Sequence, residues 1–381
     1  MFEKSEVARV VSLMLTWQCN LNCVYCFEKF KAPNKVMSFD LAKNIIKEEV
    51  HQHKNRGQKE RLKIEFFGGE PLLNFDLIKR VTEWMVEEQF DIDYELSVTT
   101  NGTLLDKDKM EWFRAHKEHI TVVMSVDGDE EMQCSNRGGK ANNIPLNFVK
   151  ETWPTIHFKS TISRDNLPSL SSNIISLLEE GFVIAPSLAV GEDWQDGDEL
   201  IYKRELEKLA DWSLSHMDKE PMKIFMQPFY CLLEPHCSNI PQKNCGTGTS
   251  MATYDVDGKC YPCHLFVPIT HGNCNVLEEL KNVDFKDDMS FMDKSCMDCK
   301  MLRICKTCYG FNYKDRQDIT KRDRRTCKMQ LAEAQVVSSF QINYLVELAK
   351  QRDLTPAELF ALQGAVKCHE LYGNFTFEVL K

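Results

Sequence analysis

The first half of the chain alternates short β-rich runs with stretches of helical periodicity, and this alternation constrains the fold most strongly. Runs rich in β-branched and aromatic residues predict strands over Val7–Leu15, Leu62–Phe67, Tyr94–Thr99, Ile120–Val126, Ile156–Ile162 and Val183–Val190. Helices are predicted between them over Asp40–His53, Leu77–Gln89, Lys107–His116, Pro145–Thr152 and Leu170–Glu180. Strands separated by helices pair in parallel through crossover connections, so the pattern predicts βαβ units around a parallel sheet, an α/β fold.

Two short motifs follow the first two predicted strands. Three cysteines are spaced Cys19-x3-Cys23-x2-Cys26, and Gly68-Gly69-Glu70-Pro71 comes 42 residues after the last of them. Three thiolates in one loop can hold three corners of a [4Fe–4S] cluster and leave the fourth iron open to another ligand. Glycines let a backbone approach a ligand closely, and a carboxylate such as that of Glu70 suits an ammonium group. On spacing alone, a zinc site or scattered buried thiols is the alternative.

Together these motifs resemble those of the radical S-adenosylmethionine (SAM) superfamily. The resemblance implies that the amino and carboxylate groups of SAM chelate the open iron. It places residues 68–71 at the methionyl ammonium and Tyr25 beside the adenine. It also implies a partial (β/α)6 barrel over residues 1–226, with Cys19 and Glu70 just past the carboxyl ends of strands one and two. Active sites of α/β folds lie at that edge.

Two later strand ends also resemble SAM contacts of this family. Thr99-Thr100-Asn101-Gly102 matches its Thr-Asn-Gly motif, and Ser125-Val126-Asp127-Gly128 with Arg137 matches the pattern after strand four. The resemblance implies that Asn101, Ser125, Asp127 and Arg137 approach the ribose, the methionyl carboxylate or the substrate. The alternative is that Asn-Gly and Asp-Gly only form turns.

A second field of cysteines lies beyond Met226. Eleven of the sixteen cysteines fall between Cys231 and Cys327, in a segment rich in turn residues and poor in apolar periodicity. Such a segment is expected to need metal to hold its fold. The absence of a secretory signal argues for a reducing compartment, and therefore for metal ligation rather than disulfides. Three Cys-x2-Cys pairs also have zinc-ribbon spacing, which keeps zinc as the alternative.

The spacing of this field resembles the SPASM domain, which carries two auxiliary [4Fe–4S] clusters in peptide- and protein-modifying radical SAM enzymes. The resemblance implies one cluster on Cys245, Cys263, Cys308 and an earlier cysteine, which is Cys237 or, alternatively, Cys231. It implies a second cluster whose ligands are Cys296, Cys299, Cys305 and Cys327. The family usually separates its last close pair by three residues, whereas two separate Cys305 from Cys308, and Cys260 is an extra thiol that could substitute.

His264 follows the matched ligand Cys263. Anaerobic sulfatase-maturing enzymes carry an aspartate there, which acts as a base on the substrate. A histidine can also accept a proton near neutral pH, so His264 is the candidate catalytic residue. The alternative is that it only forms a hydrogen bond near the cluster.

Composition and length narrow the class of protein. The chain has 381 residues and a formal net charge of −10, which weighs against a nucleic-acid substrate. No apolar run is long enough for a signal peptide or a membrane span, so a cytoplasmic location is expected. Beyond a SPASM domain over residues 227–328, residues 329–381 form a helical extension with helices predicted at Gln330–Lys350 and Pro356–Leu371.

The resemblance implies a reaction class. A one-electron reductant of flavodoxin or ferredoxin type reduces the first cluster, SAM is cleaved, and a 5′-deoxyadenosyl radical removes a hydrogen from the substrate. The first hypothesis is oxidative modification of a ribosomally made peptide by a thioether or carbon–carbon crosslink. The second is formylglycine formation in a sulfatase, and the third is electron transfer or sensing without catalysis. Since the first strand is expected near Val7, leader-peptide binding would need a separate protein or the barrel–SPASM surface.

Overall fold

The fold is mixed α/β around a parallel sheet, as the alternation of elements predicts. The computed structural model describes residues 7–141, 143–233, 243 and 245–377. Its main sheet has the strand order β4-β3-β2-β1-β7-β8, and a second sheet pairs β5 with β6 in parallel. The strands are β1 (Val7–Met14), β2 (Arg61–Phe67), β3 (Tyr94–Thr100), β4 (Ile120–Met124), β5 (His157–Ile162), β6 (Val183–Leu188), β7 (Met251–Tyr254) and β8 (Cys260–Tyr261).

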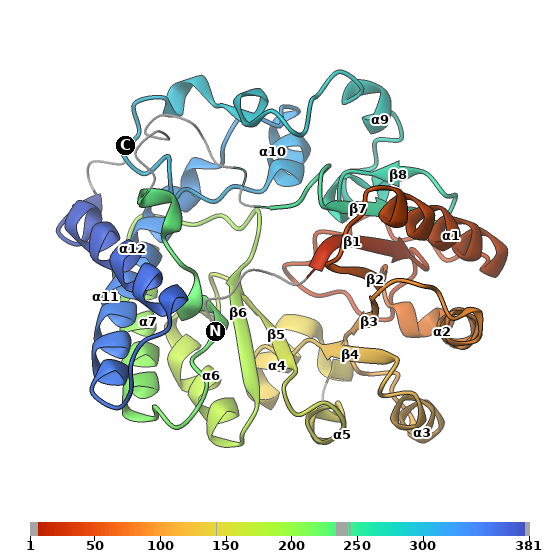
Figure 1. Ribbon diagram of the computed structural model, residues 1–381, viewed down its shortest axis with the longest axis horizontal. Coiled ribbons are helices and arrows are strands. Elements are labelled where there is room, and N and C mark those ends of the chain that lie inside the picture. The colour runs from red at the N-terminus through yellow and green to blue at the C-terminus, as the bar shows by residue number, and fades with distance from the viewer. Residues whose placement is uncertain (1–6, 142, 234–242, 244, 378–381) are drawn as a thin grey trace.

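The six predicted strands form one arc in chain order (Figure 1). β1, β2, β3 and β4 pair in parallel with their neighbours. Strand β5 continues the arc beyond β4, because Val126 N donates to Lys159 O at 2.8 Å and Ser125 bridges Lys159. All six carboxyl ends therefore meet at one edge, where the sequence predicts the site.

Helices cover the outer face of this arc. The barrel helices are α1 (Phe39–Asn55), α2 (Phe75–Glu88), α3 (Lys107–Ala115), α4 (Glu130–Arg137), α5 (Leu146–Thr152), α6 (Leu170–Glu179) and α7 (Asp198–Ser215). Alternate residues of the strands pack against them, as the fully buried Leu62, Ile64 and Phe66 of β2 illustrate. The five predicted helices are confirmed with shifted ends, whereas α4 and α7 were not predicted.

Helix α7 escaped prediction because acidic residues occupy part of its buried face. Asp198, Glu199 and Glu205 are all buried and interrupt the apolar stripe. Each has a polar partner: Glu205, for example, accepts hydrogen bonds from Ser171 N at 3.1 Å and Ser171 Oγ at 2.5 Å. Buried carboxylates are tolerated when they are hydrogen-bonded in this way, but they remove the periodicity from which a helix is recognised.

The cysteine-rich segment contains little regular structure, as expected. Its helices are the short α8 (Pro268–His271) and α9 (Val276–Glu279), followed by α10 (Tyr309–Arg316). Strand β7 was not predicted, and it extends the main sheet by pairing in parallel with β1 over Val10–Leu13. A second apolar cluster joins Met14 and Trp17 to this segment, and Trp17 Nε1 donates to Asp255 Oδ1 at 2.6 Å. The segment is thus bonded directly to the strand that leads to the cysteine triad.

Two long helices close the chain, close to their predicted positions. They are α11 (Cys327–Ala349) and α12 (Pro356–Tyr372), and α11 packs against both α7 and α12 (Figure 1). Gln341 Nε2 on α11 donates to the carbonyl oxygens of Phe225 at 2.7 Å and Gln227 at 2.8 Å. These bonds fix the loop that leads from the barrel into the cysteine-rich segment.

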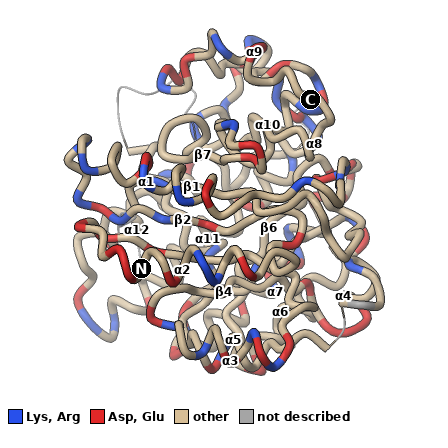
Figure 2. The backbone as a smooth tube through the Cα atoms, turned by 90° about the vertical axis from the view of Figure 1, so that its right-hand side faces the viewer, with Lys and Arg blue, Asp and Glu red and all other residues tan. Residues whose placement is uncertain are grey.

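Basic and acidic residues are interspersed along the described chain, on barrel helices and surface loops alike (Figure 2). Within the described residues, none of the helices combines the length and the hydropathy needed to cross a bilayer.

The start of α12 offers a test of local stability. Glu358 completes a capping box with Thr355 and accepts hydrogen bonds from Arg352 at 2.7 and 2.9 Å. These contacts lower the pKa of Glu358 to about 2, and the hydrogen bond from Arg352 has the largest effect. We expect Glu358→Ala to cost about 1 kcal/mol of unfolding free energy at pH 7, a value kept small because Arg352 is solvated. A carboxyl whose pKa is depressed on folding stabilises the fold above its unfolded pKa, near 4.5, and loses that effect as pH falls towards 2.

Urea denaturation of both proteins at pH 7 and at pH 3 measures the difference. The difference in unfolding free energy between the variant and the parent should be smaller at pH 3 than at pH 7. Glu347→Ala is the matched control, because Glu347 pairs with Lys350 at the exposed end of α11. A cost equal to that of this control would contradict the capping role of Glu358.

Candidate functional site

A cavity of about 580 Å³ opens at the carboxyl ends of the barrel strands. Eleven of the residues that the sequence singles out line it: Cys19, Cys23, Tyr25, Cys26, Gly68, Gly69, Glu70, Asn101, Ser125, Arg137 and His264. Pro71 and Asp127 are buried beside it without lining it. Motifs from four strand ends and from the cysteine-rich segment therefore meet in one place.

The cysteine triad lies in the loop that follows β1. Cys26 N donates to Cys23 O at 3.1 Å, and Leu21 N donates to Cys19 Sγ at 3.5 Å, so the loop folds back on itself. Burial raises the pKa of the Cys19 thiol to about 11. Each thiol must therefore lose its proton when it binds a metal, which couples metal binding to proton release.

Gly68 and Gly69 pack closely against the loop that carries the cysteine triad. Gly69 N donates to Thr16 O at 3.0 Å and Glu70 N donates to Gln18 O at 2.8 Å. A Cβ on Gly68 would lie 2.5 Å from Thr16 O, and one on Gly69 would lie 2.3 Å from Gln18 O. Only glycine allows this approach, so the motif fixes the triad loop against the end of β2.

Glu70 joins three strand ends and is almost fully buried. Its carboxylate accepts hydrogen bonds from Thr100 Oγ1 at 2.7 Å, Asn101 N at 2.9 Å and Leu72 N at 3.1 Å. Burial raises its pKa, while these donors oppose that effect. The carboxylate thus links the ends of β2 and β3, and Glu70 also lines the cavity.

Tyr25, Asp127 and Arg137 form one buried unit. Arg137 Nε and Nη2 donate to the Asp127 carboxylate at 2.9 and 3.0 Å, and Tyr25 Oη donates to the same carboxylate. The side chains of Asp127 and Arg137 are 0% and 7% exposed. Asp127 itself does not line the cavity, but it holds Tyr25 and Arg137, which do.

His264 packs against the rings of Phe27 and Phe67, whose centroids are 5.4 and 5.0 Å away. Burial lowers its pKa to about 4, although the charge of Glu65 opposes that shift. The imidazole is therefore neutral near pH 7 and has a ring nitrogen able to accept a proton.

Sequence reasoning missed Glu65 and Lys159, which lie beside His264. Glu65 Oε1 accepts a hydrogen bond from Thr99 Oγ1 at 2.9 Å and lies 3.7 Å from Lys159 Nζ. Both residues line the cavity. The pattern of β2 contained a signal, because Glu65 and Phe67 share the face opposite to the buried Ile64 and Phe66. A carboxylate on the inner face of a barrel strand is a candidate site residue.

Glu28 was also missed. It lines the cavity next to the triad, is 5% exposed, and its Oε1 accepts no hydrogen bond from the described residues. Three thiols, a buried acceptor without a partner and a cavity of this volume together fit an iron–sulfur cluster with a cationic cofactor such as SAM.

The cysteine-rich segment brings its thiols together in two groups. In the first, burial and the nearby thiols of Cys263 and Cys245 raise the pKa of Cys308 to about 12. The resemblance to the SPASM domain implies that these three thiols share a cluster, although only two residues separate Cys305 from Cys308. Cys237, the preferred fourth ligand, lies outside the described residues. Cys260 interacts instead with Tyr254, Glu49 and Arg9.

The second group lines a separate small cavity. It contains all four predicted thiols, Cys296, Cys299, Cys305 and Cys327, with Met301, Leu302 and Arg322 in its wall. Burial and the other three thiols raise the pKa of Cys327 to about 12. Within the described part of the chain, no three His, Cys, Asp or Glu side chains are arranged to hold a single metal ion.

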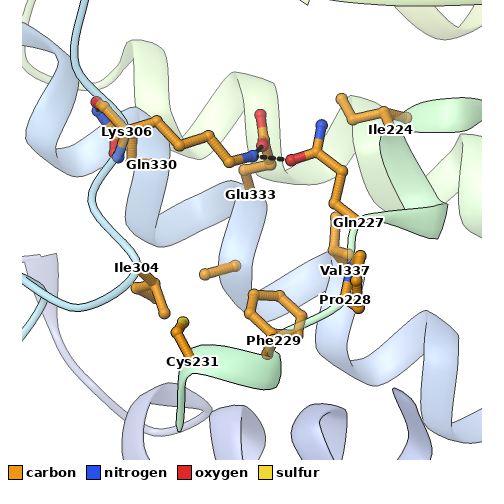
Figure 3. A pocket seen from close by; sticks show the side chains of 11 residues that line it. Ile224, Gln227, Pro228, Phe229, Cys231, Ile304, Lys306, Gln330, Glu333 and Val337 are labelled. Carbon is orange, nitrogen blue, oxygen red and sulfur yellow. Dashed lines mark hydrogen bonds and ion pairs between the residues drawn. The ribbon is translucent and has the colours of Figure 1, made fainter. Parts of the chain in front are cut away.

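Cys231, the alternative fourth ligand of the first group, lies elsewhere. It lines a cavity of about 70 Å³ between α11 and the loop after residue 226, where its Sγ approaches Arg303 O at 3.4 Å (Figure 3). Lys306 spans that cavity, pairing with Glu333 at 2.8 Å and donating to Gln227. Gln227 also lines the main cavity, and Gln330 also lines the four-cysteine cavity, so this small cavity lies between the two.

Comparison with known proteins agrees with this arrangement. Residues 14–144 match the family model of the radical SAM superfamily. The radical SAM cyclopropyl synthase TigE of Paramaledivibacter caminithermalis is 31% identical over 194 residues, which is 46% of this chain and 40% of TigE. A cysteine-type anaerobic sulfatase-maturating enzyme of Clostridium novyi is 23% identical over 318 residues, 76% of this chain and 84% of that enzyme. The chain thus spans less than half the length of TigE.

Solved structures share the fold at low identity. The anaerobic sulfatase-maturating enzyme anSMEcpe, with bound AdoMet and the Cp18Cys peptide, superposes with a TM-score of 0.66 at 19% identity, covering 90% of this chain and 99% of that one. Streptococcus suis SuiB bound to its precursor peptide SuiA gives a TM-score of 0.58 at 16% identity, covering 84% and 76%. The motifs, the strand-end cavity and the family match agree, and residues 14–144 are a radical SAM domain.

Proposed function

We propose that this chain is a radical SAM maturase of SPASM type that oxidatively modifies a ribosomally made peptide, forming a thioether, a carbon–carbon crosslink or a ring. The observation that carries this proposal is one cavity lined both by the Cys19/Cys23/Cys26 triad and by His264, Glu65 and Lys159. Relatives support a peptide: TigE is named a cyclopropyl synthase, and anSMEcpe and SuiB each bind a peptide.

The triad would hold a [4Fe–4S] cluster with SAM on its open iron, and this pair supplies reductive cleavage of SAM and abstraction of a substrate hydrogen atom. The chain's own residues bind and orient. Glu70 and Glu28 offer carboxylate oxygens to the methionyl ammonium, and Asp127 orients Tyr25 and Arg137 beside the cofactor. Phe27 and Phe67 exclude water from the reacting carbon.

His264 accepts the substrate proton at a ring nitrogen in this proposal. Its imidazole is neutral, and the nearby Glu65 carboxylate, itself paired with Lys159, stabilises the imidazolium once a proton arrives. Two auxiliary clusters, one on Cys237, Cys245, Cys263 and Cys308 and the other on Cys296, Cys299, Cys305 and Cys327, make residues 227–328 the SPASM domain. They would receive the electron released when the product is oxidised, while a cytoplasmic flavodoxin or ferredoxin supplies the first electron.

Formylglycine formation is the second candidate, since the similarity to a sulfatase-maturating enzyme extends over 76% of this chain. The presence of His264 where those enzymes have aspartate favours the peptide crosslink. A separate leader-binding protein would assist if the peptide carries a leader.

The test uses the anaerobically reconstituted full chain with SAM and dithionite. We expect 5′-deoxyadenosine to form, and a precursor peptide encoded beside the gene to lose two hydrogen atoms while keeping its sulfur. Replacement of a cysteine thiol by an aldehyde would assign formylglycine formation instead. No 5′-deoxyadenosine under these conditions would contradict radical SAM chemistry and favour electron transfer or sensing.

A further inference from the structure

Arg322 is a buried cation in the wall of the four-cysteine cavity. It lies in the loop between α10 and α11 and is 5% exposed. Its backbone N donates to Asp293 Oδ2 at 3.0 Å and its Nη1 donates to Cys305 O at 3.2 Å. The backbone of Arg322 is thus held by Asp293, and one nitrogen of its guanidinium is held by the Cys305 carbonyl.

The rest of this guanidinium lies near the Cys305 thiol but forms no further hydrogen bond of normal geometry. Nε and Nη2 are buried and form no hydrogen bond within the described residues, and no ion pair involves Arg322 there. The neighbouring carboxylate of Asp323 pairs with Arg325 at 2.7 Å and with Arg316 at 3.1 Å. Burying an arginine whose charge is not compensated destabilises the fold, so an anion bound at this site would be stabilising.

Four thiols line the same cavity as this charge, and the Tyr309 hydroxyl also acts on it. Among them, Cys305 and Cys296 interact with Arg322 most strongly. Four neutral thiols do not compensate a cation, whereas four thiolates around an iron–sulfur cluster carry a net negative charge. A guanidinium has five donors in a fixed plane and stays charged at any pH at which the protein is folded, which suits it to a permanent counter-ion role.

We propose that Arg322 is the buried counter-cation of an iron–sulfur cluster held by Cys296, Cys299, Cys305 and Cys327, donating Nε–H and Nη2–H to its sulfurs and raising its reduction potential. This inference rests on the proposed function, since it takes these cysteines as cluster ligands. A fixed positive charge and hydrogen bonds to sulfur both favour the more negative, reduced state. Arg322 is therefore a positioning residue that makes this cluster a better electron acceptor.

The experiment measures midpoint potentials of the reconstituted holoenzyme by redox titration followed by electron paramagnetic resonance. We expect Arg322→Gln to weaken one-electron reduction of one auxiliary cluster about tenfold, a shift of about −59 mV, with the iron content unchanged. Arg324→Gln is the matched control: it removes the same charge from an exposed neighbour that hydrogen-bonds Ser295. The charge of Arg324 also acts on Cys296 and Cys327, but solvent screens it, so its removal should shift the potential much less.

Arg322→Lys keeps the positive charge but loses the planar set of guanidinium donors. It should therefore retain the iron and shift the midpoint potential by an intermediate amount. If Arg322→Gln loses iron, retention of iron by Arg322→Lys supports the counter-cation role, whereas loss in both variants overturns it in favour of simple packing. Equal potentials in Arg322→Gln, Arg324→Gln and the parent also overturn it. Failure of the proposed function looks different, because the parent itself would then hold only about four irons, or zinc, instead of about twelve.

Discussion

Changing Cys19, Cys23 and Cys26 together to alanine is expected to abolish SAM cleavage and remove one cluster. The parent should hold about twelve irons per chain and the triple variant about eight, because three four-iron clusters become two. SAM cleavage should fall to background, since no other described cysteine lines the main cavity. Anaerobic iron and sulfide analysis measures the first effect, and chromatographic assay of 5′-deoxyadenosine measures the second.

Cys134→Ala is the control for this experiment. Cys134 lies on α4, outside both cysteine groups and the cavity, so its replacement should leave iron and SAM cleavage unchanged. A triple variant that still cleaved SAM would refute the role of the triad. A parent with about four irons and bound zinc would refute the two auxiliary clusters instead.

The second large effect is expected at Asp127. Replacing Asp127 by alanine leaves the Arg137 guanidinium, 7% exposed, buried without its bidentate partner, which should cost about 3–5 kcal/mol of unfolding free energy. Tyr25 and Arg137 would also lose their orientation beside the cavity, so SAM binding should weaken. Chemical denaturation and equilibrium SAM binding measure the two effects.

An exposed ion pair supplies the comparison. Asp93 pairs with Arg61 at 3.2 Å and its side chain is 59% exposed, so Asp93→Ala should cost less than about 1 kcal/mol. The double change Asp127→Asn with Arg137→Met removes the uncompensated charge and should recover much of the stability without restoring SAM binding. A cost for Asp127→Ala as small as that of Asp93→Ala would show that the buried pair does not hold the site together.

The strands and the site motifs were accessible from sequence because each rests on local chemistry. β-branched runs act over few residues and predicted six strands, while the eleven cavity residues came from short motifs that resemble those of a known family. The elements that could not be predicted from the sequence form only in their tertiary context. Strand β7 has only four residues, and it becomes a strand because β1 offers it hydrogen bonds.

Tertiary context also explains why the contact between Asp127 and Arg137 could not be predicted. The Asp-Gly motif at Asp127 marks a strand end correctly, but whether a carboxylate there faces a ligand or a neighbouring arginine depends on helix α4, which was not predicted. Glu65 and Arg322 were missed because their importance comes from the side chains around them: a lysine and a histidine for one, four thiols for the other.

The pairing of β7 with β1 has a consequence for electron flow. Electrons tunnel between metal centres at rates that fall steeply with distance, so a pathway functions only if its separations stay constant. Strand β1 leads into the triad loop, and β7 lies between the cysteines of the first auxiliary group, Cys245 and Cys263. One continuous hydrogen-bonded sheet thus joins the two cysteine loops, so if both loops hold clusters as proposed, the backbone itself would fix the spacing between them.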